Sequence, residues 1–361
     1  MSFYNNSSSS TSNSGVLLEI SLSEILLAIK PSEDDVTART QIINELKATV
    51  GGMRSQNLRG ASVELFGSFV SNLYTRWGDL DISVQLPDDQ VYNSTALRDI
   101  KGALQRRGIF HIVDFIPEAR VPILAVASNR NNIHCDISIN NWKGLINSKF
   151  LSWITQIDGR FRDMVLLIKE WAKSRDINSP KDGTLNSYSL SLLVIFHFQT
   201  CEPAIFPPLK EIYAGNIVKD FRGGRLTVTE ERNIHDTCNS NIERFRRNLT
   251  NVNKSSVSEL FVSFFQKFST IKTMASDRVI CTYSGQWEQK RNYFRRSTPL
   301  LIEDPIDRPE NAARAVMYMS HLDKISEACE ETYQKLLSVG CDKTSLISSL
   351  VSREVSSKIL I

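Results

Sequence analysis

Three aspartates fall on two short segments whose alternation predicts β-strands. In DLDISV, Asp79 and Asp81 flank one apolar residue, and in NIHCDISI, Asp136 stands between two. Because the side chains of a strand alternate between its faces, the apolar residues share one face and the acids share the other. Three carboxylates with no Lys or Arg in either segment repel one another unless cations lie between them. The pattern predicts a site for Mg²⁺ or Mn²⁺, and two such ions can hold the attacking and leaving oxygens of a phosphoryl transfer.

The dipeptide Gly67-Ser68 supports this interpretation, because it follows the strand-like run VELF and precedes Asp79 by eleven residues. A glycine there permits a sharp turn into a helix, whose backbone N–H groups and the Ser68 hydroxyl would face a phosphate above the sheet. Gly-Ser alone is a common turn, and Asp-x-Asp alone is typical of a solvated strand face. The glycine turn and the third acid together favour the metal site.

A strongly helical segment carries Lys169 and Lys173 four residues apart, so that both ammonium groups share one face. Two cations on one face repel each other unless an anion binds above them, and a nucleotide triphosphate is such an anion. An ordinary solvated face with Glu170 and Asp176 close by explains the same spacing. The spacing alone does not decide between the two interpretations.

The composition excludes several classes of protein. The 361 residues include 43 Lys and Arg against 40 Asp and Glu, and a net charge of +3 excludes nucleic-acid binding through global charge. No segment reaches the roughly 18 consecutive apolar residues of a membrane span, so no membrane partner is expected. The six cysteines form no CxxC pair, and the N-terminus has no secretory signal pattern. Both features are typical of an intracellular protein with reduced thiols.

The predicted elements indicate an α+β domain and a mainly helical domain. The Ser- and Asn-rich residues 1–15 are expected to be disordered. Ser32 and Asp35 have the spacing of a capping box, and five alternating β-branched runs between residues 63 and 139 predict strands. Helical spacing is found at 16–30, 32–50, 93–107, 159–175, 186–200, 235–248, 256–270, 310–337 and 341–361.

A basic and aromatic segment, QWEQKRNYFRR, has the character of a surface that holds single-stranded nucleic acid. Its aromatic rings can stack on bases and its cations can pair with phosphates, and the cations are Lys290, Arg291, Arg295 and Arg296. A β-hairpin with basic side chains lying over a small apolar face explains the segment equally well. No RNP, zinc-knuckle or KH signature is present, so target choice is expected to depend on a protein partner.

The longest motifs identify a family resemblance. GSFVSNLYTRWGDLDISV with a later strand aspartate resembles the polymerase-β-like nucleotidyltransferases. MVLLIKEWAKSRDINSPKDGTLNSYSL and LIEDPIDRPENAARAV resemble the poly(A)-polymerase-like terminal nucleotidyltransferases, specifically the terminal uridylyltransferases. The resemblance covers approximately residues 20–330, and within the family it extends to plant enzymes that uridylate unmethylated small RNAs.

The resemblance implies a fold and a reaction. A polymerase-β-like catalytic domain with a mixed sheet would occupy residues 31–141. A helical domain would comprise 16–30 and 142–361, with a PAP-associated segment near 255–320 and the active cleft between the domains. Asp79, Asp81 and Asp136 would carry two divalent ions, Mg²⁺ or Mn²⁺, while an RNA 3′-hydroxyl attacks the α-phosphate of UTP and pyrophosphate leaves. The substrate would be single-stranded or small RNA, in the nucleus or cytoplasm.

The resemblance also implies a nucleotide pocket. Tyr188 would stack on the base, although a lone tyrosine is more often a core residue. Asn147 and Ser148 would contact the ribose, although from the residues alone they read as a helix cap. Asp304 would accept a hydrogen bond from the base, whereas Glu310 stands where many uridylyl-adding relatives have a histidine. The full expected set is Gly67, Ser68, Asn147, Ser148, Lys169, Lys173, Ser187, Tyr188, Asp304, Glu310 and Asn311.

Glu310 weakens the expectation of UTP, because an ionised glutamate accepts hydrogen bonds and cannot donate one to uracil O4. Asn311, which can do both, is the neighbouring candidate. An RNA adenylyltransferase of the same fold therefore remains open. Two further alternatives do not depend on Glu310: a nucleotidyltransferase acting on a small molecule, and a non-catalytic binding module. Three crowded acids argue against the last.

Overall fold

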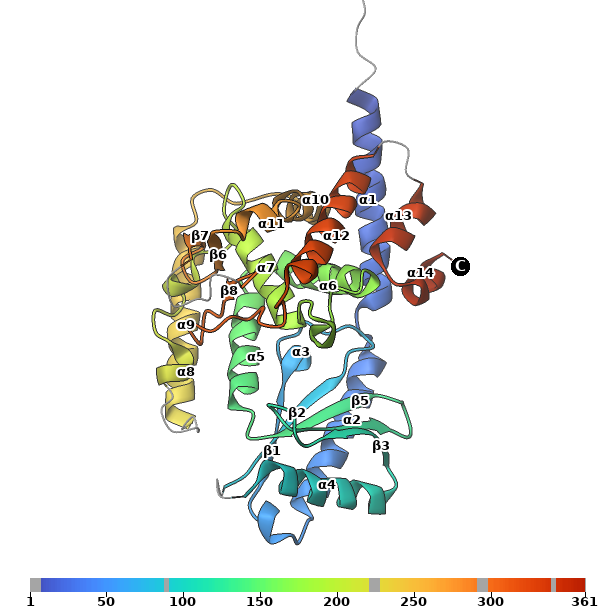
Figure 1. The fold of residues 1–361 in the computed structure, drawn as a ribbon, viewed down its shortest axis with the longest axis vertical. Coiled ribbons are helices and arrows are strands. Elements are labelled where there is room, and N and C mark those ends of the chain that lie inside the picture. The colour runs from blue at the N-terminus through green and yellow to red at the C-terminus, as the bar shows by residue number, and fades with distance from the viewer. Residues whose placement is uncertain (1–7, 88–90, 221–227, 291–297, 339–341, 361) are drawn as a thin grey trace, which may run out of the picture. The chain divides into compact units, whose positions relative to one another are not determined.

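The structure is a computed structural model that describes residues 8–87, 91–220, 228–290, 298–338 and 342–360. The chain forms two compact units. The sheet unit comprises Ile29–Gln156, and the helical unit comprises the described residues outside that range. The predicted combination of an α+β region and a mainly helical region is confirmed (Figure 1).

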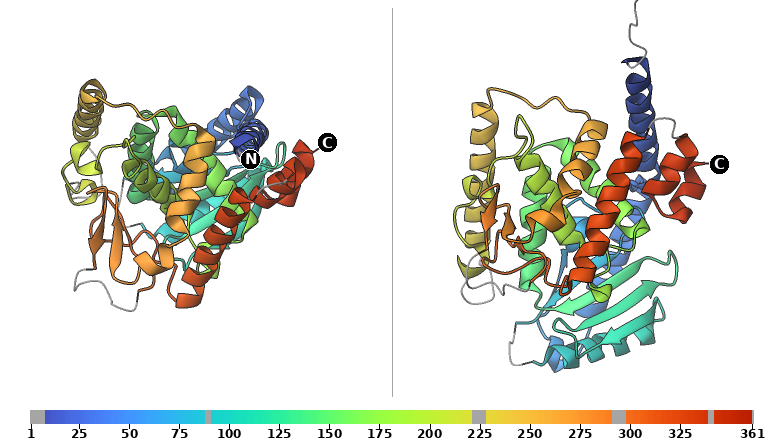
Figure 2. Two further views of the ribbon diagram at one scale, coloured as in Figure 1. Left: turned by 90° about the horizontal axis from the view of Figure 1, so that it is seen from above. Right: turned by 45° about the horizontal axis from the view of Figure 1, so that its top comes forward.

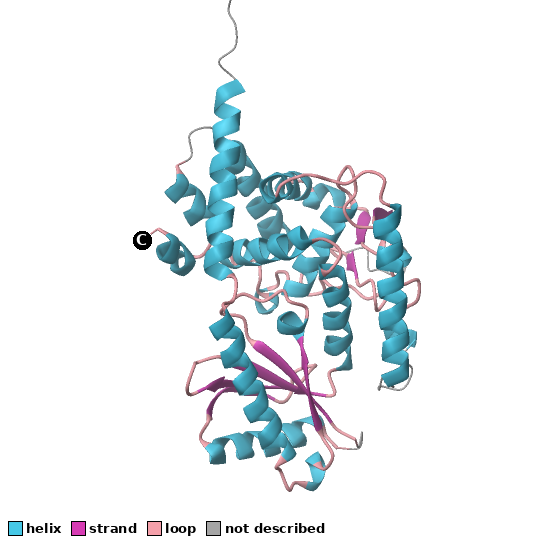
Figure 3. Cartoon of the chain, turned by 180° about the vertical axis from the view of Figure 1, so that it is seen from behind, coloured by secondary structure: helices cyan, strands magenta, loops and turns pink. Residues whose placement is uncertain are grey.

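A five-stranded mixed sheet with the strand order β1-β2-β5-β4-β3 is the centre of the sheet unit. β2 and β5 run parallel, and every other neighbouring pair is antiparallel. Seen from behind, helices of this unit lie across the strands (Figure 3). In chain order the elements are α2 (Glu33–Gly51), η1 (Gln56–Leu58), β1 (Ser62–Phe66), α3 (Gly67–Val70), β2 (Leu80–Gln85), α4 (Asn93–Arg107), β3 (Phe110–Ile116), β4 (Ile123–Ser128), β5 (His134–Ile139) and α5 (Trp142–Thr155).

The alternation read from the sequence decides which face of the sheet is covered. Leu80, Ile82 and Val84 of β2 are each at most 1% exposed. They belong to one core with apolar side chains of α2 and α4. Full burial of such a side chain contributes about 1.5–3 kcal/mol. The opposite face of β2 and β5 is therefore left to the polar and acidic residues.

The start of the chain differs from the prediction. Helix α1 spans Ser8–Ile29, so it begins seven residues before residue 15, the expected end of disorder. Extending a helix that an apolar segment has already nucleated costs little per residue, which explains why the Ser- and Asn-rich turns continue it. The capping box of α2 is confirmed, because the Ser32 side chain accepts from the Asp35 N–H and the Asp35 side chain accepts from the Ser32 N–H.

The helical unit is built around α6, α7, α10 and α12. Figure 2 shows α10 beside α12, and the two helices are in contact. Apolar faces of α6 and α10 meet where the ring centroids of Trp171 and Phe265 are 4.6 Å apart. The elements are α1, α6 (Gly159–Ser174), η2 (Pro180–Asp182), α7 (Ser187–Gln199), η3 (Leu209–Glu211), α8 (Ile217–Asp220), α9 (Val228–Asn248), α10 (Val257–Phe268), α11 (Ile271–Met274), β6 (Arg278–Cys281), β7 (Gln286–Gln289), β8 (Ile302–Glu303), α12 (Met319–Leu337), α13 (Lys343–Leu350) and α14 (Arg353–Ile359).

Three sequence predictions for this region are corrected. A second sheet, β7-β6-β8, lies within the domain predicted to be mainly helical, where the sequence offered only a β-hairpin in the segment QWEQKRNYFRR. Residues 310–318 are turns and a β-bridge, and the helix predicted over 310–337 begins only at Met319. The boundary expected at residue 141 moves to Gln156, because α5 packs against β1 and α3. Short strands and turns depend on pairing with distant segments, which local periodicity does not reveal.

Candidate active site

Two of the three aspartates face each other across neighbouring parallel strands. The register of β2 and β5 pairs Asp81 directly with Asp136. Both side chains are half-buried, and Asp79, one residue before β2, is exposed. All three belong to the face opposite the apolar core, as the alternation predicts. Because the two strands pair, Asp136 joins Asp81 on this face.

All three carboxylates act on the pKa of Cys135. This buried thiol lies on β5 beside Asp136 and pairs in register with Leu80. Burial, followed by the negative charges of Asp79, Asp136 and Asp81, raises the pKa of Cys135 to about 12. Since each of the three acids acts on one thiol, they are gathered at the same end of the sheet. The thiol itself stays protonated and inert.

Gly67 allows Asp81 to lie against the backbone at the end of β1. Its φ of +71° is in the left-handed region. A Cβ at this position would lie 1.8 Å from Asp81 Oδ2 and 2.5 Å from its Cγ. Only glycine fits both the backbone conformation and this close approach. The predicted sharp turn into a helix is confirmed, since α3 begins at Gly67 and carries Ser68 in its first turn.

The Gly67 turn is fixed by Ser148 from α5. The Gly67 N–H donates to Ser148 Oγ at 2.5 Å, and that hydroxyl donates to the Gly144 carbonyl at 2.6 Å. Ser148 is only 3% exposed, and these two bonds show it positioning the Gly67 turn. Its neighbour Asn147 differs, because its buried Oδ1 has no hydrogen-bond partner.

Arg39 is a positioning residue that the sequence did not reveal. Its guanidinium, 1% exposed, donates from Nη2 to the carbonyls of Arg76 (2.7 Å) and Gly78 (2.8 Å). The segment held in this way leads directly into Asp79. Burial lowers the pKa of Arg39, while neighbouring negative groups that include Asp79 oppose that shift. The carbonyl partners lie 37 and 39 residues away in the chain, so no local pattern predicts them.

The donor set of this face suits a hard divalent cation. Carboxylate oxygens on adjacent strands are the ligands that Mg²⁺ and Mn²⁺ prefer. Across the described ranges no three His, Cys, Asp or Glu side chains form a complete cage for an ion. Mg²⁺ sites are commonly made from one or two carboxylates completed by substrate phosphates and water, so the pair Asp81 and Asp136 fits this arrangement.

In the helical unit, α6 carries both lysines predicted to bind a triphosphate, but their environments differ. Lys169 is 8% exposed, whereas Lys173 in the last turn is exposed. α6 also has a buried apolar face, where Phe161, Val165 and Ile168 are at most 1% exposed. A lysine buried to this degree is not part of an ordinary solvated face.

Tyr188 and Asp304 are joined by a hydrogen bond. The Tyr188 hydroxyl donates to Asp304 Oδ1 at 3.0 Å, and the Ile306 N–H donates to the same oxygen at 3.2 Å. Asp304 is 2% exposed, and the tyrosine at the start of α7 is half-buried. Burial and the charge of Asp304 raise the pKa of Tyr188 well above its usual value. Ser187 exchanges long hydrogen bonds with Asn178 at 3.4 and 3.5 Å.

The two residues proposed for base choice have different environments. The Asp304 N–H donates to the Glu310 carbonyl at 2.8 Å, and the Glu310 side chain is exposed. Asn311 Oδ1 accepts from Ile302 N and Ala313 N, and its Nδ2 donates to the Leu300 carbonyl. Asn311 therefore orders the strand segment around β8, which its sequence alone did not indicate.

The basic and aromatic segment is described only up to Lys290. Trp287 on β7 packs against Phe196 with ring centroids 5.5 Å apart, and β7 pairs with β6 in an antiparallel hairpin. Lys290 Nζ donates to the Thr298 carbonyl at 3.1 Å. These contacts agree with the hairpin interpretation. Arg291, Arg295 and Arg296 lie outside the described residues.

No helix in the described ranges has the length and apolar character needed to cross a membrane.

The sheet unit is a mixed sheet with two aspartates in register beside a Gly-Ser turn, and a helical unit accompanies it. This combination defines a polymerase-β-like nucleotidyltransferase fold. Residues 18–156 match the family described as the central palm domain of mitochondrial-like poly(A) RNA polymerase. Two solved structures are each 25% identical to this chain. A cytoplasmic RNA terminal U-transferase has a TM-score of 0.70, covering 93% of this chain and 98% of that one. The Cid1 poly(U) polymerase bound to MgGTP has a TM-score of 0.71, and the match covers 94% of this chain and 99% of that one.

Sequence relatives give the family. Protein HESO1 of Arabidopsis thaliana is 46% identical over 349 residues, which are 94% of this chain and 67% of that protein. Terminal uridylyltransferase cid1 of Schizosaccharomyces pombe is 36% identical over 41% of this chain and 38% of its own length. Poly(A) RNA polymerase cid11 of the same yeast is 27% identical over 80% of this chain and 56% of its own length. The chain belongs to the poly(A)-polymerase-like terminal nucleotidyltransferases, the family of Protein HESO1.

Proposed function

We propose that this protein is an RNA terminal uridylyltransferase that transfers UMP from UTP to the 3′-hydroxyl of an RNA and releases pyrophosphate. The observation that carries the proposal is the direct pairing of Asp81 with Asp136 beside the Gly67 turn. That arrangement occurs in a chain that is 46% identical to Protein HESO1 and 36% identical to a terminal uridylyltransferase.

The sheet unit supplies the groups around the reacting phosphorus. Asp79, Asp81 and Asp136 would hold divalent cations, which would stabilise the negative charge that develops on the phosphate oxygens. Asp136 accepts the proton of the RNA 3′-hydroxyl. The hydroxyl oxygen forms a bond to the α-phosphorus, and the bond from that phosphorus to pyrophosphate breaks. The unpartnered Asn147 Oδ1 accepts a hydrogen bond from a ribose hydroxyl, which favours ribonucleotides over deoxynucleotides.

The helical unit supplies the contacts to the rest of the nucleotide. Lys169 and Lys173 bind the triphosphate, and Ser187 donates to one of its oxygens. Tyr188 stacks on the base through a ring whose hydroxyl is held by Asp304, and such stacking is worth about 1–3 kcal/mol. Asp304 accepts the N3–H of uracil.

The second candidate function is an RNA adenylyltransferase, which differs from the first in the nucleotide that it selects. One relative, cid11, is a poly(A) RNA polymerase that matches 80% of this chain, and Glu310 has no hydrogen to donate to uracil O4. We infer that uracil is preferred because the 46% identical relative and both solved structures above group this chain with the uridine-adding branch. Glu310 then acts through its bulk or through bound water.

We further propose that the substrate is a small or single-stranded RNA and that a protein partner directs target choice. The five described cysteines are free thiols, which fits the reducing environment of the nucleus or cytoplasm.

The test is an extension assay with a labelled RNA that has a free 3′-hydroxyl, Mg²⁺ or Mn²⁺, and each ribonucleoside triphosphate separately. We expect a ladder with UTP that exceeds the ladder with ATP. Asp81→Asn and Asp136→Asn should each lower kcat by about 100-fold or more. Asp114→Asn, an exposed aspartate on β3, is the matched control and should extend normally.

A ladder with ATP alone would contradict the base assignment while leaving the catalytic aspartates intact. Absence of extension with every triphosphate would favour a small-molecule acceptor. Retained activity in both Asp→Asn variants would contradict the metal assignment.

A further inference from the structure

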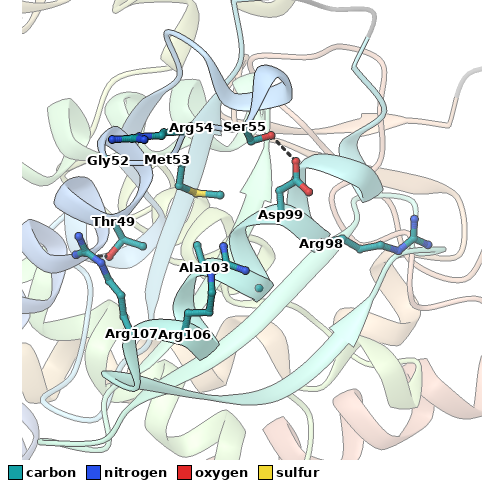
Figure 4. A pocket seen from close by; sticks show the side chains of 11 residues that line it. Thr49, Gly52, Met53, Arg54, Ser55, Arg98, Asp99, Ala103, Arg106 and Arg107 are labelled. Atoms are coloured by element: carbon teal, nitrogen blue, oxygen red, sulfur yellow. Dashed lines mark hydrogen bonds between the residues drawn. The ribbon is translucent and has the colours of Figure 1, made fainter.

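A basic pocket lies on the side of the sheet unit that faces away from the catalytic aspartates. It has a volume of about 460 Å³ and is formed by the end of α2, the loop that follows it, and α4 (Figure 4). Both helices cover the apolar face of the sheet, whereas the aspartates lie on its other face. The volume falls within the range of roughly 300–1,000 Å³ found for small-molecule sites. Nothing in the proposed reaction uses this pocket.

The lining is strongly cationic. It contains four arginines against one acid, and the arginines are Arg54, Arg98, Arg106 and Arg107. None of them forms an ion pair with an acidic group of the described chain. The acid, Asp99, is bound by neutral donors, since its Oδ2 accepts from Ser55 Oγ at 2.6 Å and from Asn57 Nδ2 at 2.9 Å. Four positive charges of the lining therefore face the single negative charge of Asp99, and none of them forms a direct ion pair with a described residue.

One guanidinium group is bound by a short side chain, and a glycine leaves room for another. Arg107 Nη1 donates to Thr49 Oγ1 at 3.1 Å, which connects the end of α4 to α2. Arg106 Nη1 would be 3.3 Å from a Cβ at Gly102, so this glycine leaves room for the guanidinium against its own helix. In Figure 4, Arg98 points away from Arg106 and Arg107.

We propose that this pocket binds a phosphomonoester, either the 5′-terminal phosphate of an RNA or the phosphate of a free nucleotide. Guanidinium groups match the geometry of phosphate oxygens through paired hydrogen bonds, and a phosphomonoester carries up to about two negative charges. Met53 and Ala103 give the pocket an apolar wall suited to a sugar or base. Binding of an RNA 5′-phosphate rests on the proposed function, because the RNA that is extended would then contact both faces of the sheet unit.

The alternative role for Arg106 and Arg107 is to stabilise the last turn of α4 by interacting with the negative end of its dipole. That role predicts an effect on folding stability and no dependence on a phosphate. The two roles are therefore distinguished by a binding measurement on folded protein.

The experiment compares hexauridylate bearing a 5′-phosphate with the same oligomer bearing a 5′-hydroxyl. Binding is measured by fluorescence anisotropy in EDTA without triphosphate. Both probes have the same 3′ end, so the difference in Kd isolates the 5′-phosphate and does not require catalysis. We expect the phosphorylated oligomer to bind at least about tenfold more tightly. Arg106→Gln with Arg107→Gln should remove this preference and reduce the salt slope by about 1–2.

Arg130→Gln removes one positive charge from an exposed position of the same unit, outside the pocket, and should keep the preference. Arg54→Gln, on the loop, provides a second test if the double variant is unfolded by circular dichroism. Competition with UMP then identifies the source. Displacement at similar concentrations indicates a site for free nucleotides, and resistance to UMP indicates a site for the RNA end.

Equal affinity for the two oligomers would overturn the proposal in favour of a general surface for the RNA backbone. Equal losses in the pocket variants and in Arg130→Gln would overturn it as a nonspecific charge effect. Displacement by polyglutamate as effective as by UMP would indicate a site for an acidic protein. Failure of the extension assay with UTP would leave the binding result unaffected, so the two proposals fail separately.

Discussion

Replacement of Gly67 by alanine tests whether the exact position of Asp81 controls catalysis. The backbone of Gly67 has a φ of +71°, and the added Cβ would lie 1.8 Å from Asp81 Oδ2. An ordinary contact at this position begins near 3.4 Å. The carboxylate must therefore move by about 1.5 Å or the end of β1 must shift, and a misplacement of about 1 Å costs roughly 100-fold in rate.

Part of the effect on stability does not depend on Asp81. A left-handed backbone costs an alanine about 1–2 kcal/mol, and this penalty applies wherever such a glycine is replaced. Gly108 is the matched control, because its φ is +65° and nothing lies within 4 Å of its added Cβ. Gly108→Ala has the backbone penalty alone, whereas Gly67→Ala combines it with the displacement of Asp81.

The assay measures kcat and KM for UTP in RNA extension, together with the free energy of unfolding in urea. We expect Gly108→Ala to lose about 1–2 kcal/mol of stability, and Gly67→Ala to lose more because Asp81 must also move. Only Gly67→Ala should lose about 100-fold in kcat. The reasoning is refuted if Gly67→Ala extends RNA at the rate of Gly108→Ala, because the position of Asp81 would then be unimportant for the reaction.

Three further predictions follow from contacts in the two units. Arg39→Lys keeps the charge but cannot reproduce both bonds to the carbonyls of Arg76 and Gly78, so kcat should fall more than KM rises, and normal steady-state kinetics would contradict the positioning role. Tyr188→Phe keeps the ring but leaves Asp304 without its hydroxyl donor, so KM for UTP should rise about tenfold with kcat nearly unchanged, as initial rates against UTP would show. Burial and, to a smaller extent, the nearby Lys267 lower the pKa of His197 from 6.5 to about 3. The unfolded chain therefore binds a proton that the folded chain does not, and stability falls as pH decreases from 6.5 towards 3. Between pH 7 and pH 5 the His197 contribution is about 2 kcal/mol, so His197→Gln should show a correspondingly smaller pH-dependent loss in urea unfolding, and an unchanged loss would exclude the assignment.

Most of the acidic face of the sheet could be predicted from local pattern. The alternation in DLDISV and NIHCDISI determines which side chains share a face, because a strand has a period of two residues. The strand of Asp81, the strand of Asp136 and the helix that carries both lysines lie where the sequence predicts them. The capping box of Ser32 and Asp35 is equally local, since its partners are three residues apart.

The tertiary structure alone decided how these elements meet. The register that pairs Asp81 with Asp136, the bond from Ser148 to Gly67 and the contacts of Arg39 join residues that are distant in the chain. The β6–β8 sheet depends on the same kind of pairing, and so does the structural use of Asn311. Periodicity reports the burial of one segment and contains no information about its partner. The types of residue in the site could therefore be inferred from the sequence, but their support and spacing required the folded chain.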